Sequence, residues 1–152
     1  MKPRHFLKQL DHDRIVSAIA DAEKKTSGEI RVLISHREVD DPVAAAEKAF
    51  LRLGLQRTRH RNAVLIFVAP RSHRFAVIGD QAVHEKCGEA FWVELAATMT
   101  GYFKRDDFTE GLVHGIKRAG ELLAAHFPSD PIRQAQGRPD DKNRQSNTVI
   151  ED

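Results

Sequence analysis

Apolar residues recur along this chain with two different spacings, which together predict a domain of alternating helices and strands. Spacings of three and four residues are typical of the buried face of a helix. They occur over residues 11–26, 41–54, 81–103 and 107–127. Nearly continuous apolar runs are typical of strands that are covered on both faces. They occur over residues 29–36, 62–69 and 74–79.

Capping residues support the ends of the helical segments. Asp11 and Asp41 stand where a short carboxylate can accept hydrogen bonds from the free amides of a first helical turn. Asp107 and Glu110 have the spacing of a capping box. Gly88 stands inside the third helical segment, which we expect to form either one helix or two.

The order of the segments predicts a mixed sheet. Strand, helix and strand over residues 29–69 form a βαβ unit, in which the two strands run parallel. A tight turn at residues 70–73 then makes the third strand antiparallel to the second. The end of the third strand and the starts of the first two therefore share one edge of the sheet. We expect Glu29, Asp80 and Glu85 to converge there.

Three carboxylates at one edge of the sheet suggest a site for a divalent cation. Carboxylate oxygens such as those of Glu29, Asp80 and Glu85 are the ligands that Ca²⁺ and Mg²⁺ prefer. The alternative is that Asp80 only caps the following helix, while both glutamates are solvated.

A basic loop precedes the second strand at the same edge. Arg57, Arg59 and Arg61 are a candidate anion-binding site for a phosphate group or an acidic partner. The alternative is a solvated connection whose arginines pair with helix carboxylates. The opposite edge is also basic and offers a second candidate surface for polyanions. Its residues are Arg37, Arg71 and His73.

Composition narrows the class of protein. Among 152 residues, 24 Lys+Arg against 22 Asp+Glu give a net charge of +2, which is too balanced for a dedicated nucleic-acid binder. No apolar run approaches the roughly 20 residues that span a bilayer. A cytoplasmic protein without a transmembrane segment is the simplest interpretation.

The single cysteine, Cys87, excludes an internal disulfide and a multi-cysteine metal site. His84 stands three residues before it, a spacing that allows an activated thiolate. A partly buried, unreactive thiol is the favoured alternative.

The composition changes from Pro128 onward. Residues 129–152 contain only four apolar residues, too few to offset the conformational entropy lost on ordering. We therefore expect a domain over residues 1–127 and a flexible polar tail over residues 128–152.

Common catalytic motifs are absent from the chain. It has no Walker loop, no dinucleotide-binding glycine fingerprint and no nucleophile elbow. Sequence motifs therefore assign no catalytic residue and leave open whether the protein is an enzyme.

Several stretches resemble the TPM domain family, most closely its short soluble bacterial branch. They are Thr26-Ser-Gly-Glu-Ile-Arg-Val32, Arg61-Asn-Ala-Val-Leu-Ile-Phe-Val-Ala69, Arg74-Phe-Ala-Val-Ile-Gly-Asp80 and Phe103-Lys-Arg-Asp-Asp-Phe-Thr-Glu-Gly111. The resemblance covers about residues 11–127 and implies an α/β fold, a three-layer α/β/α sandwich. It also implies a divalent-cation site in some members, acid phosphatase activity in a plant relative, and accessory roles in others.

On this basis we interpret the chain as a small accessory or interaction module with an unknown protein partner and a site for Ca²⁺ or Mg²⁺. The alternative is a phosphomonoesterase related to the TPM phosphatases. In that enzyme Glu29, Asp80 and Glu85 would hold the cation, which would activate water or polarise a phosphoryl oxygen. Arg61 would stabilise the developing charge.

Overall fold

A four-stranded mixed sheet forms the centre of the computed structural model, which describes residues 10–129 and 148–152. The strand order is β3-β2-β1-β4. The strands are β1 (Glu29–Ile34), β2 (Ala63–Ala69), β3 (Arg74–Gly79) and β4 (Val149–Glu151). Both β2 and β4 run parallel to β1, and β3 runs antiparallel to β2. The predicted βαβ unit and its antiparallel third strand are confirmed.

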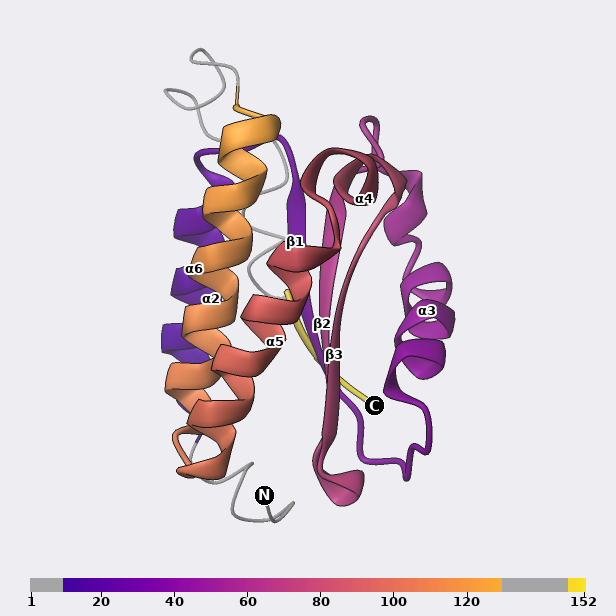
Figure 1. Ribbon diagram of the computed structural model, residues 1–152, viewed down its shortest axis with the longest axis vertical. Helices are drawn as coiled ribbons and strands as arrows, with labels where there is room; N and C mark the ends of the chain where they lie inside the picture. The colour runs from indigo at the N-terminus through magenta and orange to yellow at the C-terminus, as the bar shows by residue number, and fades with distance from the viewer. Residues whose placement is uncertain (1–9, 130–147) are drawn as a thin grey trace.

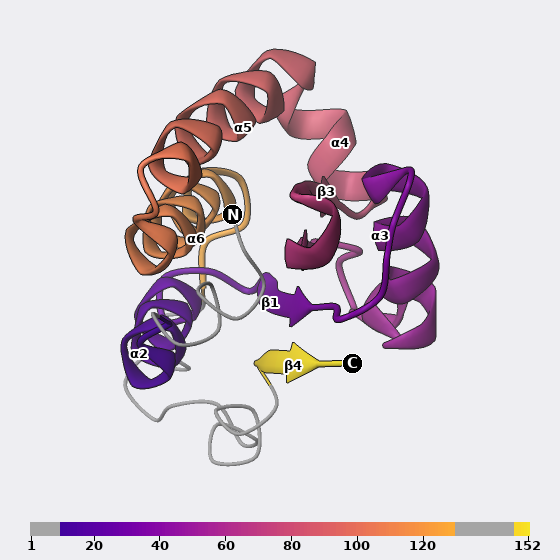
Figure 2. The ribbon, with the colours of Figure 1, turned by 90° about the horizontal axis from the view of Figure 1, so that it is seen from below.

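Helices cover both faces of the sheet and complete the predicted three layers (Figure 1). One face carries α2, α5 and α6, and the other carries α3 (Figures 1 and 2). The helices are α2 (His12–Glu23), α3 (Pro42–Arg52), α4 (Gln81–Cys87), α5 (Glu89–Lys104) and α6 (Phe108–His126), with short 3-10 turns η1 (Leu55–Arg57) and η2 (Pro70–Ser72). Gly88, at φ +72°, separates α4 from α5. No helix in the described part of the chain is long and apolar enough to cross a membrane.

The sheet divides the apolar core into two clusters. The larger cluster joins Ile30 and Val32 of β1 to the helices α2, α5 and α6. The smaller cluster joins Leu33 of β1 and Phe67 of β2 to Phe50 of α3. All seven positions of β2 are buried, which explains why its sequence is a continuous apolar run rather than an alternating one.

Two of the helix caps predicted from the sequence are present in the structure, and one is not. The carboxylates of Asp11 and Asp41 accept first-turn amides of α2 and α3, as predicted. The predicted capping box of α6 is wrong, because Glu110 pairs with Arg14 of α2 instead. Helices α2 and α6 pack together, so Glu110 reaches a full positive charge, which binds it more strongly than a neutral amide. The hydrogen bond from Arg14 lowers the pKa of Glu110.

The end of the chain departs from the expectation of a flexible tail over residues 128–152. Its last residues form β4, which pairs with Val32–Ile34 of β1. Three residues are too few to show a strand pattern in the sequence, but the open edge of β1 offers them backbone partners. Val149 is buried against the larger core cluster. Residues 130–147, most of the expected tail, lie outside the described residues.

Candidate functional site

The starts of β1 and β2 and the end of β3 lie at one rim of the sheet, as the topology predicts. Glu29 is in register with Ala63, and Val64 is in register with Gly79. The amide of Asp80 continues this register, because it donates to the carbonyl of Ala63 at 2.9 Å. The predicted shared edge is therefore confirmed for the backbone positions of Glu29 and Asp80.

Asp80 is buried and fully engaged by its neighbours. Both of its oxygens receive the guanidinium of Arg61, with Nε–Oδ2 at 2.7 Å and Nη2–Oδ1 at 2.9 Å. Oδ1 also accepts the amide of Gln81 at 2.8 Å and so caps α4. Bidentate charge-assisted bonds of this kind are strong and directional. They raise the pKa of Arg61, with the hydrogen bond to Asp80 as the main cause.

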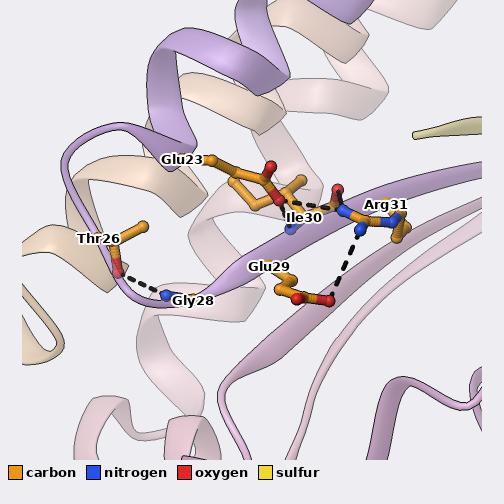
Figure 3. Close-up of polar contacts among 6 residues, drawn as sticks. All are labelled: Glu23, Thr26, Gly28, Glu29, Ile30 and Arg31. Carbon is orange, nitrogen blue, oxygen red and sulfur yellow. Dashed lines mark hydrogen bonds and ion pairs between the residues drawn. The ribbon is translucent and has the colours of Figure 1, made fainter. Parts of the chain in front are cut away.

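Glu29 belongs to a second group of charges, at the start of β1 (Figure 3). Arg31 lies between two carboxylates, with Nη2 at 3.6 Å from Glu29 Oε2 and Nη1 at 3.0 Å from Glu23 Oε2. The same Glu23 oxygen accepts the amide of Ile30 at 2.8 Å. Glu23 is only 6% exposed, so this ion pair is held inside the protein rather than at its surface.

The residues between these charges fasten β1 to the end of α6. The Thr26 hydroxyl donates to the carbonyl of Phe127 and accepts the amide of Gly28 at 3.0 Å. Ser27 receives the side-chain amide of Asn62 at 3.0 Å. A β-carbon on Gly28 would lie 3.0 Å from the backbone carbonyl oxygen of Asn62, so the close approach favours glycine. The stretch that resembles the family thus builds the rim of the sheet.

Glu85, the third predicted ligand, lies on α4 and is exposed. Its Oε1 accepts a hydrogen bond from Gln81 Nε2 at 3.4 Å. Within residues 10–129 and 148–152, no three side chains of the metal-binding types come close enough to share an ion. As they are arranged here, Glu29, Asp80 and Glu85 do not fit a common cation.

The predicted anion-binding arginines are not equivalent. Arg61 is committed to Asp80, whereas Arg57 and Arg59 are exposed on the connection before β2. At the opposite rim, Arg71 pairs with Glu38 at 3.3 Å. The structure therefore supports the alternative of arginine–carboxylate pairing for Arg61. It leaves Arg57 and Arg59 accessible to solvent.

The thiol of Cys87 lacks the electrostatic setting of a nucleophile. Burial raises its pKa above the ordinary value, and nearby Lys86 lowers it by less. The neutral thiol is therefore favoured at physiological pH, which supports the alternative of an unreactive cysteine. His84 is near the ring of Trp92, at 6.3 Å between centroids.

An open groove of about 870 Å³ lies between α3 and α5, beside β3. Three exposed apolar side chains line it: Val43 (49% exposed), Leu51 (60%) and Val93 (62%). Strand β3 is the outer strand of the sheet at this side (Figure 2). Trp92 also lines the groove, and its Nε1 is buried without a hydrogen-bond partner in the described chain.

Comparison with known proteins assigns the family. A model of the TPM domain matches residues 1–122. The chain belongs to the TPM domain family. A search of curated proteins found no match.

Two solved structures resemble this TPM domain. The NMR structure of the BA42 protein from the psychrophilic bacterium Bizionia argentinensis is 33% identical, with a TM-score of 0.78, and the match covers 95% of this chain and 96% of that one. The N-terminal domain of the cg2496 protein from Corynebacterium glutamicum is 16% identical, with a TM-score of 0.60, over 81% and 80% of the two chains. The second similarity shows the fold alone.

Sequence reasoning missed two features of this TPM domain. The buried pair of Glu23 and Arg31 carries a weak signal, a lone charge within the apolar run of β1. The groove carries a signal too, because Leu51 and Val93 fall outside the apolar faces of their helices. Neither signal shows which elements meet, so the sequence could not place the groove.

Proposed function

We propose that this TPM domain is an interaction module that binds a partner protein in the groove between α3 and α5. One observation carries the proposal. The three large apolar side chains that stand out as exposed in the described chain, Val43, Leu51 and Val93, all line this one groove. Single exposed apolar residues are ordinary, but apolar residues gathered at one place mark interaction sites.

Site-specific cross-linking tests this proposal. A photoreactive amino acid is placed at Leu51 in the groove and, as a control, at the exposed Ser17 on α2. In cells that produce the protein, we expect one adduct from position 51 that position 17 does not give. The adduct should fall at least tenfold when Val93→Asp is added, because a buried charge opposes docking. Equal adducts from both positions, or none, would contradict the proposal.

The metal-assisted phosphomonoesterase stays the alternative proposal, with Ca²⁺ or Mg²⁺ as the cation. The shared rim of Glu29 and Asp80 supports it. The bidentate pair of Asp80 with Arg61 opposes it, since a cation would have to displace the guanidinium.

Turnover of a generic phosphomonoester with added Mg²⁺ or Ca²⁺ separates the two proposals. If the catalytic site lies at this rim, turnover should be lost in Asp80→Asn. This variant keeps a side-chain oxygen that can accept the capping hydrogen bond of α4. No turnover with either ion, or turnover unchanged in that variant, would eliminate this site.

A further inference from the structure

We propose that the groove takes an extended, basic peptide segment of a partner, which adds a strand to the free edge of β3. The inference rests on the proposed docking function and names the chemistry of its partner. It joins three observations: an outer strand whose free edge meets no further strand in the described chain, apolar walls on both sides of it, and one carboxylate on each wall.

The outer edge of β3 offers backbone hydrogen-bonding groups. In an antiparallel pair, alternate residues of each strand bond to the partner strand. The bond from the Asp80 amide to Ala63 fixes this alternation. With this alternation, the backbone N–H and C=O groups of Phe75, Val77 and Gly79 point away from β2. They face the side where the described chain places no further strand. Such an edge is a template for another strand.

The walls of the groove suit the two faces of an added strand. Successive side chains of a strand point to opposite faces of its sheet. One set would meet Val43 and Leu51 on α3, and the other would meet Trp92 and Val93 on α5. Val77 and Gly79 line the groove between these walls, so the unpaired backbone and the apolar contacts are available to one segment together.

The charges around the groove favour a basic segment. Glu47 on α3 and Glu89 on α5 stand on opposite walls. The third carboxylate, Asp80, is neutralised by Arg61, and His84 is the remaining titratable group of the lining. A second copy of this chain would bring its own two glutamates against these, so like charges would oppose pairing of two β3 edges.

Intrinsic fluorescence can measure binding without labels. The chain has one tryptophan, Trp92, and it lines the groove. The probe is a capped nine-residue peptide of alternating threonine and valine with a lysine at each end. We expect a saturable change in fluorescence with the full chain, and at least tenfold weaker binding when glutamate replaces both lysines. The double variant Glu47→Gln/Glu89→Gln should reduce this preference between the two peptides.

Backbone methylation of the probe tests strand addition itself. One peptide is N-methylated at its odd positions and another at its even positions. Only one set of amides faces the edge of an added strand, so we expect one isomer to lose at least tenfold in affinity and the other to bind like the parent. This comparison uses the unaltered protein and does not depend on the folding of any variant.

The outcomes separate the inference from the docking function. Equal binding of both isomers, with loss of binding in Leu51→Asp, would overturn strand addition and leave the groove as a docking site. If no peptide binds, the inference of strand addition is overturned. The docking function of the groove would then still be judged by the cross-linking experiment. A dimer in sedimentation that Leu51→Asp dissociates would assign the groove to a second copy and would also overturn it.

Discussion

Single glycines set how closely α2, α5 and α6, which form one helical layer, approach one another. On α6, a β-carbon at Gly115 would lie 2.8 Å from the sulfur of Met99, and one at Gly120 would lie 2.6 Å from the β-carbon of Ala22. Real β-carbons do not come this close, so the absent side chains allow α6 to pack against both α5 and α2. Gly101 on α5 differs, because a β-carbon there would meet only Arg105, at 3.6 Å.

These contacts predict opposite effects for the same substitution at two helical positions. Gly120→Ala should lower the free energy of unfolding by about 1–2 kcal/mol, because overpacking exceeds the gain in helix propensity. Gly101→Ala should raise it by up to about 1 kcal/mol, because the added methyl group gains helix propensity and makes only an ordinary contact with Arg105. Urea unfolding measures both variants. A stabilised Gly120→Ala would show that α2 and α6 are not so closely packed.

At the scale of elements, a carboxylate from a helix takes the place of a neighbouring strand. Strand β4 pairs with β1 only from Val32 onward, so among the described residues no strand lies beside the earlier part of β1 on that side. Glu23 of α2 accepts the amide of Ile30 there and holds Arg31 in the same contact. Helix α2 is thereby tied to the start of β1 by polar bonds as well as by the core.

Removing this carboxylate should be costly. Glu23→Ala should reduce the free energy of unfolding by about 3 kcal/mol, because it leaves a buried guanidinium and an edge amide without this partner. Glu121→Ala is the matched control, since Glu121 pairs with Arg118 on the exposed side of α6. Its loss should cost no more than about 0.5 kcal/mol. Equal costs in chemical denaturation would contradict a structural role for the buried pair.

At the scale of the whole molecule, the sheet has two edges of different character. On one side the outer strand is the three-residue β4, which the last residues of the chain supply and which pairs with β1. The edge at β3 lies in the groove between helices. In the described part of the chain β4 is thus a short outer strand, whereas the six-residue β3 presents the longer edge, in the groove where the partner proposed above would bind.

Deleting residues 148–152 tests the role of β4. Loss of the buried Val149 side chain and of its backbone pairing should lower the free energy of unfolding by about 2 kcal/mol. It should also promote self-association, because it uncovers the edge of β1. Thermal unfolding and sedimentation measure the two effects. The control, Glu151→Gln, keeps the strand and should change neither, and a truncated chain as stable and monomeric as the full one would contradict the prediction.

For the candidate site, only the backbone positions of the residues could be predicted from the sequence. The order of strands placed Glu29 and Asp80 at one rim, because parallel and antiparallel pairing fix where strands begin and end. The partners of these carboxylates were not predictable, since Arg61 lies 19 residues from Asp80 along the chain. A carboxylate at a strand end has the same local sequence whether it binds a cation, caps a helix or pairs with arginine.

The sequence by itself determined the helices, the first three strands and their directions, because apolar periodicity follows from which face of each element is buried. The three layers were implied by the resemblance to the TPM domain family. The tertiary structure alone decided which charges pair, where β4 attaches and where a groove forms. The physical reason is that these features depend on contacts between segments far apart in the chain, such as Arg14 with Glu110, 96 residues apart. Packing of the helices on the sheet, rather than any local pattern, brings such residues together.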